Sequence, residues 1–264
     1  MLRGLSRGRF GSRMVFVSRI AAACFIVALP LFLITANVRI LASDADYYKH
    51  GFRKYHADQV TGVSMADLDR SAGQIISYFE DDSDTLRIIV TQDGQEVSLF
   101  NARETAHMKD VKSLMRLVFR LNEISLAVVL TYVVCVFLWS REKPLRTLAV
   151  QSLAGVALGF TVILAVGAFA LAGFDQAWTK FHEIAFSNDL WQLNPATDHL
   201  IQMFPEKFWE EATFFVAALT VGEALTIVIA ASAYLLMTRK RAETSPREAS
   251  AAAPAGDVTR SASG

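Results

Sequence analysis

The chain has 264 residues, with 26 basic and 26 acidic side chains, so its formal net charge at pH 7 is +0. Hydrophobic residues make up 53% of it, and the mean hydropathy is +0.32. This composition excludes an ordinary soluble domain and indicates a membrane protein with several spans.

Four apolar segments are long enough to cross a hydrocarbon core, which needs about 20 helical residues. They comprise residues 15–41, 116–140, 148–174 and 212–238. Within the third segment, Gly155 and Gly159 form a face of small residues suited to close helix packing. The sequence therefore predicts an all-α membrane protein with four transmembrane helices, carrying a small α+β cap outside the cytoplasm.

Lys and Arg cluster beside the ends of these segments, and such clusters favour the cytoplasmic side. They are Arg3, Arg7, Arg9 and Arg13 before the first span, Arg141, Lys143 and Arg146 between the second and third, and Arg239, Lys240 and Arg241 after the fourth. Lys49, Arg53 and Lys54, just after the first span, oppose this bias but are outnumbered.

Both termini are therefore predicted to be cytoplasmic. Residues 1–14 form a basic N-terminus, 141–147 a cytoplasmic loop, and 239–264 a tail whose Ala, Ser and charged residues indicate disorder. Residues 42–115 and 175–211 are predicted to lie on the outer face.

A signal peptide cleaved near residues 41–45 is the alternative for the N-terminus. The first apolar segment is longer than the about 7 to 15 residues of a signal core, which favours a retained span. Cys24 and Cys135 both fall within predicted spans, so the sequence predicts no disulfide and no thiol nucleophile on the outer face.

The first outer segment predicts a helix followed by a hairpin. Ser64 and Asp67 are typical of a helix N-terminus, and apolar residues follow them at helical spacing. Residues 86–91 and 97–100 flank a turn that contains Asp93 and Gly94, a pattern typical of a tight β-hairpin. Because such a hairpin is marginal alone, we expect it to pack on the helix and on the second outer segment.

The second outer segment is rich in polar and aromatic residues. Its turn formers and helix caps are Asn188, Asp189, Asn194, Pro195, Thr197, Asp198 and Pro205. Its aromatic residues are interpreted as a belt at the membrane surface: Trp191, Phe204, Phe208 and Trp209.

Two histidines lie a few residues from the outer ends of predicted spans. Helical spacing puts His107 on one face with Arg103 and Asp110, and His182 begins the second outer segment's polar stretch. Imidazole exchanges a proton near neutral pH and donates a hydrogen bond to a developing oxyanion. His107 and His182 are therefore the candidate catalytic pair, although each also fits a hydrogen-bonded surface residue. The other histidines are interpreted as structural: His50, His56 and His199.

Three alternatives use other chemistry. Zinc bound by the two histidines and Asp189 is possible, but Phe186 stands where a helical zinc motif has its second histidine. Ser187 lacks the glycines of a nucleophile elbow. Glu223, near the middle of the fourth span, fits either a transport pathway or a protonated acid bonded to another helix.

Two unconnected stretches resemble the bacterial lipoprotein intramolecular transacylase family of four-span membrane proteins. They are residues 99–112, LFNARETAHMKDVK, and residues 181–208, FHEIAFSNDLWQLNPATDHLIQMFPEKF. Both stretches fall in the expected order and on the predicted outer face.

The resemblance implies a membrane enzyme that moves the sn-2 acyl chain of a diacylglyceryl lipoprotein to the α-amine of its own N-terminal cysteine, which gives a lyso-form lipoprotein. It implies an outer-face site in the bacterial cytoplasmic membrane, with the diacylated lipoprotein N-terminus and membrane lipid as partners. No nucleic acid, cofactor or metal is expected. A lipid-binding or partner-binding family member without activity, and a transporter using Glu223, are the alternatives.

His107 and His182 match the family's catalytic pair. One is expected to act as base for an amine that is mostly protonated at neutral pH, and the other as oxyanion donor. A neighbouring Glu104 or Asp110 favours His107 as the base. Supporting roles are assigned to Arg103, Glu104, Asp110, Asn188, Asp189, Trp191, Asn194 and Asp198.

Overall fold

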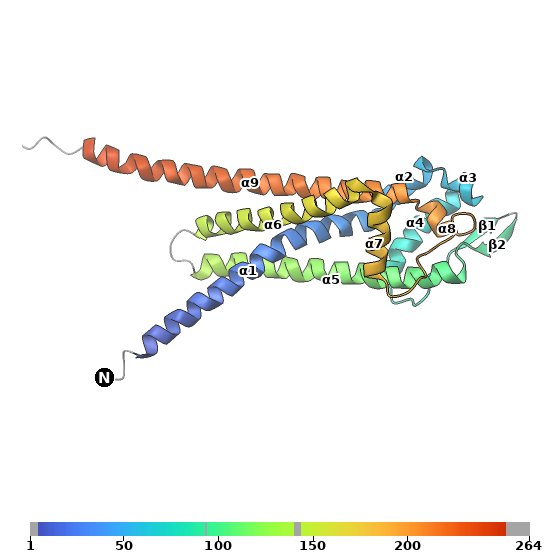
Figure 1. Cartoon of the computed structure of the whole chain (residues 1–264), viewed down its shortest axis with the longest axis horizontal. Helices are drawn as coiled ribbons and strands as arrows, with labels where there is room; N and C mark the ends of the chain where they lie inside the picture. The colour runs from blue at the N-terminus through green and yellow to red at the C-terminus, as the bar shows by residue number, and fades with distance from the viewer. Residues whose placement is uncertain (1–4, 93, 140–143, 252–264) are drawn as a thin grey trace, which may run out of the picture.

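Long helices dominate the computed structural model, which describes residues 5–92, 94–139 and 144–251 (Figure 1). Within these residues, four helices are long and apolar enough to cross a membrane. They are α1 (Leu5–Ala42), α5 (Ala102–Trp139), α6 (Pro144–Ala172) and α9 (Glu206–Ala251). The predicted all-α membrane architecture with four spans is confirmed.

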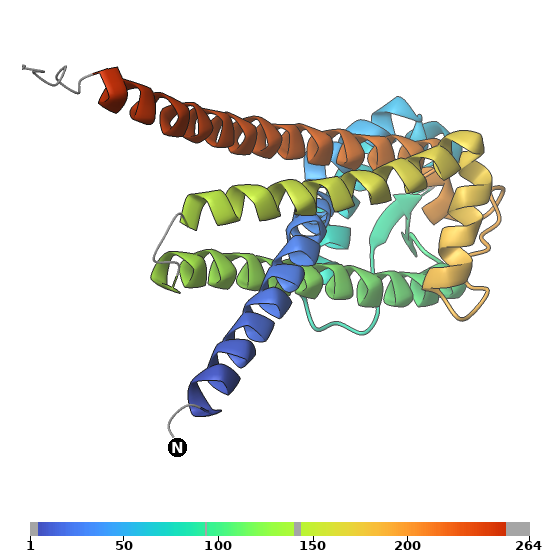
Figure 2. The same cartoon turned by 60° about the vertical axis from the view of Figure 1, so that its left-hand side comes forward.

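Helix α1 is the centre of the bundle, because it packs against α5, α6 and α9 (Figures 1 and 2). Its contact with α6 depends on two glycines. A methyl group built at Gly159 would lie 2.8 Å from the Pro30 side chain, and one at Gly155 would lie 3.1 Å from the carbonyl oxygen of Ile26. These small residues allow the close helix approach that the sequence predicts.

The cap stands at one end of the bundle and is built mainly from α2 (Ala45–Lys54), α3 (Ala57–Thr61), α4 (Met65–Glu80), β1 (Ile89–Gln92), β2 (Gln95–Ser98) and α8 (His199–Met203). Its buried core includes Phe52, Leu68, Ile75, Leu99 and Met203. These residues come from both outer segments, so the cap is a single packed unit as expected.

Helix α4 begins where the sequence predicts, because the Ser64 hydroxyl oxygen accepts a hydrogen bond from the Asp67 backbone N–H. The Asp67 carboxylate does not complete a capping box. It accepts hydrogen bonds from the Ser64 hydroxyl and from the Thr91 backbone N–H instead, which ties α4 to strand β1.

The predicted hairpin is present. Strands β1 and β2 pair antiparallel, with Gln92 opposite Gln95, and Gly94 in the turn has φ of +77°. A positive φ at this position favours glycine, which is why the sequence signal was clear. Asp93, the other turn residue, lies outside the described residues.

Two segments differ from expectation. For residues 175–211 the sequence indicates turns and helix caps from Asn188 onward, but the structure adds a helix before them, since α7 (Phe174–Ala185) begins almost directly after α6 ends. The tail was predicted to be disordered from residue 239, but α9 remains helical to Ala251. Ala, Glu and Arg favour helix, and extending an existing helix needs no new nucleation step. The rest of the tail, residues 1–4 and residues 140–143 lie outside the described residues.

The glycine contact generates a prediction about stability. Gly159→Ala should lower the free energy of unfolding by about 1–3 kcal/mol relative to Gly167→Ala, because overpacking in a close contact costs about this much. Gly167 is on the same helix and has open space around it, so the helix-propensity gain is common to both variants. Thermal unfolding of both purified variants in the same detergent measures the difference, and equal stability would contradict it.

Candidate functional site

His107 lies in the second turn of α5, whose start is fixed by a reciprocal cap. The Asn101 side-chain oxygen accepts from the backbone N–H groups of Arg103 and Glu104, and the Glu104 carboxylate accepts from the Asn101 backbone N–H at 2.8 Å. This is a capping box. It fixes the first turns of α5 and thereby the place of the His107 ring.

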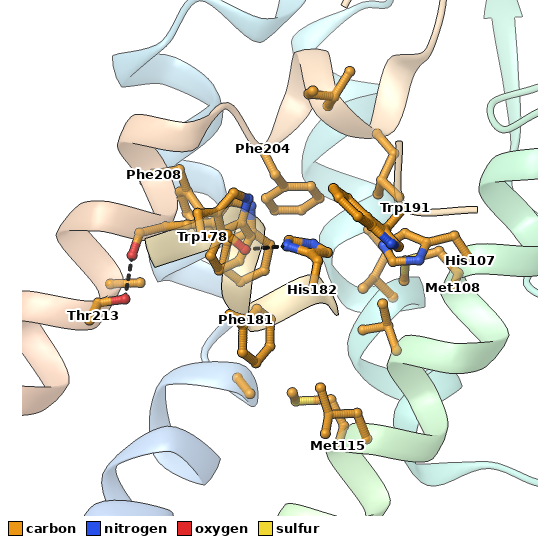
Figure 3. Close-up of a pocket in the computed structure, with 18 of the residues that line it drawn as sticks. His107, Met108, Met115, Trp178, Phe181, His182, Trp191, Phe204, Phe208 and Thr213 are labelled. Carbon is orange, nitrogen blue, oxygen red and sulfur yellow. Dashed lines mark hydrogen bonds between the residues drawn. The ribbon is translucent and has the colours of Figure 1, made fainter. Parts of the chain in front are cut away.

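His182 lies in the last turn of α7, and its tautomer follows from its hydrogen bond. The ring Nδ1 lies 2.8 Å from the carbonyl oxygen of Trp178, one turn earlier on the same helix (Figure 3). Because a carbonyl oxygen only accepts, Nδ1 carries the proton in the neutral ring. The unprotonated nitrogen of His182 is therefore Nε2.

The two histidines meet in one cavity of about 410 Å³ between the cap and the bundle. Their ring centroids are 6.2 Å apart, and the side chains are 6% and 7% exposed for His107 and His182. Phe186 packs against both rings, and the Trp191 ring lies 4.9 Å from His182 (Figure 3). Segments 75 residues apart thus bring two imidazoles into one enclosed space.

Most of the cavity wall is apolar. It includes Leu41 of α1, Met108 and Met115 of α5, Trp178 of α7 and Phe204 before α9. Burial among these groups lowers the pKa of His182, and the hydrogen bond to Trp178 raises it in part. His107 keeps a buried Nδ1 without a hydrogen-bond partner. The cavity therefore holds a ring nitrogen that is free to bond to a ligand.

Polar contacts hold the loop after α7 against α5. The Arg103 guanidinium donates to the backbone carbonyl of Asp189. One turn past His107, the Asp110 carboxylate accepts from the Asn188 side-chain amide at 2.9 Å. These bonds stand on either side of His107 along α5, and they place the loop that carries Trp191.

Glu104 joins the two outer segments from inside. Its side chain is 1% exposed, and its second oxygen accepts from the Leu200 backbone N–H at 2.6 Å. Asp198 makes a parallel link, because its carboxylate accepts from the Asn101 side-chain amide and from the Asn194 backbone N–H. The predicted capping role of Asp198 is therefore replaced: it stands at the start of α8, but its side chain makes no cap hydrogen bond there.

Comparison of the sequence with known protein families identifies its family. A protein-family model described as lipoprotein intramolecular transacylase Lit matches residues 23–209 of the sequence. The chain belongs to this family.

Individual relatives are more distant. An uncharacterized protein of Aquifex aeolicus (strain VF5) is 30% identical over 121 residues, a match that covers 46% of this chain and 51% of that relative, about half its length. The solved structure of the membrane integral lipoprotein intramolecular transacylase Lit from Bacillus cereus matches with a TM-score of 0.66 at 15% identity, and covers 86% of this chain and 99% of that one. A variant of it with one histidine replaced by alanine matches at 0.67, with 16% identity and coverage of 89% and 100%. At this identity the likeness shows a shared fold.

In the described part of the chain, neither Glu104 nor Asp110 forms a hydrogen bond to the His107 ring. The nearby acids therefore do not favour His107 as the base, contrary to what the sequence had indicated. Glu104 is occupied by Asn101 and Leu200, and Asp110 by Asn188. Sequence spacing placed these acids near the histidine, but side-chain partners depend on which loop packs against the helix.

The aromatic belt interpretation is also wrong for the buried residues of the set. Phe204 and Phe208 are buried in the cap core, and Trp191 and Trp209 line the cavity. Two aromatic residues to which the sequence gave no role at the site, Trp178 and Phe186, contact His182. Their signal was their position four residues to either side of His182, which puts them on its helical face or just beyond.

The alternative chemistries do not form a site. Among the described residues, no three His, Cys, Asp or Glu side chains lie close enough to hold one metal ion, so His107, His182 and Asp189 do not converge as a zinc site. Glu223 does not line the cavity and accepts a hydrogen bond from Asn37 at 2.9 Å, joining α9 to α1. Its interpretation as an interhelical contact fits this geometry.

The buried carboxylate generates a prediction. Glu104→Ala leaves the buried Leu200 backbone N–H unpaired, which costs about 1–3 kcal/mol, and also removes the acceptor of the part-buried Asn101 N–H. Thermal unfolding should show a clear loss of stability. Glu96→Ala, at an exposed carboxylate of β2, is the control and should stay within about 0.5 kcal/mol. A Glu104 variant as stable as this control would show that the two N–H groups find other partners.

Proposed function

We propose that the chain is an intramolecular transacylase. It moves the sn-2 acyl chain of a diacylglyceryl lipoprotein to the α-amine of that lipoprotein's N-terminal cysteine, and releases the lyso-form. The observation that carries this proposal is the pair of buried histidines in one apolar cavity of a chain from the transacylase family. An apolar cavity suits acyl chains, and two imidazoles suit acyl transfer to an amine.

His182 is the proposed base. Its Nδ1 proton is held by the Trp178 carbonyl, so its Nε2 lone pair is the one available to a substrate. The lowered pKa of the ring keeps it neutral at physiological pH, and only the neutral ring accepts a proton.

His107 is the proposed oxyanion donor. Its Nδ1 lacks a partner in the described structure, and a tetrahedral oxyanion would supply the acceptor. The rings lie 6.2 Å apart by centroid and no hydrogen bond between them is formed, so a reacting ester can stand between base and donor.

The steps balance without an acyl-enzyme. The neutral amine nitrogen attacks the ester carbonyl carbon, the C–N bond forms, and His107 donates to the oxyanion. His182 takes the proton from the nitrogen. The ester C–O bond then breaks, and the proton passes from His182 to the departing sn-2 oxygen, which becomes a free hydroxyl. Because ester and amine belong to one molecule, positioning them close together gives a high effective concentration.

The remaining site residues are proposed to position this pair. Arg103, Asp110, Asn188 and Asp189 hold the loop that carries Trp191, while Glu104, Asn194 and Asp198 join the two outer segments. We further propose the predicted orientation, with both termini in the cytoplasm and the cavity on the outer face of the bacterial cytoplasmic membrane. The basic clusters at the span ends support it.

Replacing either histidine tests the function. In a bacterium whose lipoproteins stay diacylated, the intact chain should produce lyso-form lipoproteins, which mass spectrometry of their N-terminal peptides detects. His182→Ala should lower the rate by about 10²–10⁴-fold, as expected for loss of a general base. His107→Ala should lower it by about 10²–10³-fold, as for loss of one oxyanion donor.

His50→Ala is the matched control, because His50 is exposed on α2 and does not line the cavity. It should leave the rate unchanged. If the intact chain accumulates normally in the membrane and the lipoproteins stay unchanged, the protein is better described as a family member that binds lipid or a partner without catalysis.

The tautomer of His182 is a second test. Nitrogen NMR of histidine-labelled protein in detergent should show a neutral ring with the proton on Nδ1, and its signal is assigned by its loss in His182→Asn. Since burial lowers the pKa of His182, this ring should become doubly protonated only below the ordinary histidine pKa of about 6.5. Activity attributable to the base should therefore be retained at pH 6.5 and lost only as the pH falls further, through the lowered pKa of His182. A neutral ring with the proton on Nε2 would contradict the assignment of His182 as base.

A further inference from the structure

Helix α7 crosses the direction of the spanning helices steeply in both views (Figures 1 and 2). It follows α6 after a single residue, Gly173, at the outer end of the third span. With 12 residues, α7 is also shorter than the about 20 residues that a membrane span needs.

Three stripes divide the surface of α7. The cavity stripe carries Trp178 and His182. A polar stripe of exposed residues contains Gln176, Lys180 and Glu183 at spacings of four and three, with Lys180 and Glu183 paired at 2.5 Å.

The third stripe is apolar, with Phe181 and Ile184 exposed and Ala177 half-buried. It contains Ala177, Phe181 and Ile184, also at spacings of four and three, and Ile184 is 85% exposed. Exposed apolar residues at the outer end of α6, Phe169 and Leu171, extend the same kind of surface onto a membrane span, and Leu171 is 76% exposed. A helix with one apolar face and one charged face is typical of the membrane interface.

The edge of the cavity is also divided into an apolar side and a charged side. Of the described residues that line it, Phe181 and Glu206 are the exposed ones. Phe181 belongs to the apolar stripe of α7, whereas Glu206 is a charged residue at the start of α9. One side of the opening is therefore apolar and the other is charged.

We propose that α7 lies in the outer membrane interface, with Ala177, Phe181 and Ile184 in contact with lipid acyl chains, and that the cavity opens to the bilayer at Phe181. The apolar stripe is buried about 5–10 Å into the interface. His182 is then held at the level where acyl chains meet the head groups, and a lipid reaches it from the side of the membrane without crossing water. The inference depends on the membrane fold and not on the proposed activity, so it can be tested without an activity assay.

Spin labels on single cysteines test the depth of α7. Cys24 and Cys135 are first replaced by alanine, and the full chain is reconstituted in phosphatidylcholine vesicles. Single cysteines are then placed at Ala177, Phe181 and Ile184, and as matched controls at Gln176 and Glu183, which precede members of the apolar stripe by one residue. Relaxation by oxygen, which partitions into lipid, is compared with relaxation by a water-soluble nickel chelate.

Oxygen should dominate at the three apolar positions and nickel at the two polar ones, with a several-fold difference in the ratio between neighbours such as Ile184 and Glu183. Equal nickel accessibility at these two positions would overturn the proposal. Protection of Ile184→Cys from both reagents would also overturn it, because protein would then cover the stripe. If Phe181→Cys is the one apolar position that nickel reaches, the proposed opening of the cavity to the bilayer is overturned. Ile184 is exposed and does not line the cavity, so its variant reports even where Phe181→Cys disturbs the cavity.

Discussion

A buried carboxylate, Glu104, joins the two halves of the outer region, and Asp198 makes a parallel link. Glu104 accepts from Asn101 at the start of α5 and from Leu200 at the start of α8, which lies 96 residues beyond Glu104 along the chain, so one side chain caps both helices. Each hydrogen bond satisfies a backbone donor that a helix end leaves unpaired. The rest of the site depends on this link, since the same turns of α5 carry His107 and the same outer segment carries His182 and Trp191. A carboxyl group this deeply buried needs hydrogen-bond partners, and both of its oxygens have one.

The two histidines have similar burial and different chemistry. The Trp178 carbonyl fixes one proton of His182, while the Nδ1 of His107 has no partner. This difference of one hydrogen bond is the basis for proposing His182 as the base and His107 as the donor. The apolar wall contributes to both roles, because a low dielectric strengthens each hydrogen bond made to a substrate.

Membrane geometry explains why the site is built from three directions. The spans supply a rigid frame through α1 and its close contact with α6. The cap, which has a core of its own, and α7 both contribute residues to the cavity wall. The proposed reaction between an acyl ester and an amine would use both the apolar wall and the two imidazoles of this cavity.

The sequence by itself determined the spans, the α4 helix, the hairpin and the glycine contact, because each depends on local composition or on spacing along one element. It also singled out His107 and His182, through two stretches that resemble a known family. Only the tertiary structure decided that Glu104 and Asp110 bind partners other than His107, that Phe204 and Phe208 are buried, and that Trp178 sets the tautomer of His182. The physical reason is that hydrogen-bond partners and burial depend on which distant segments pack together, and spacing along one helix does not specify the loop that covers it.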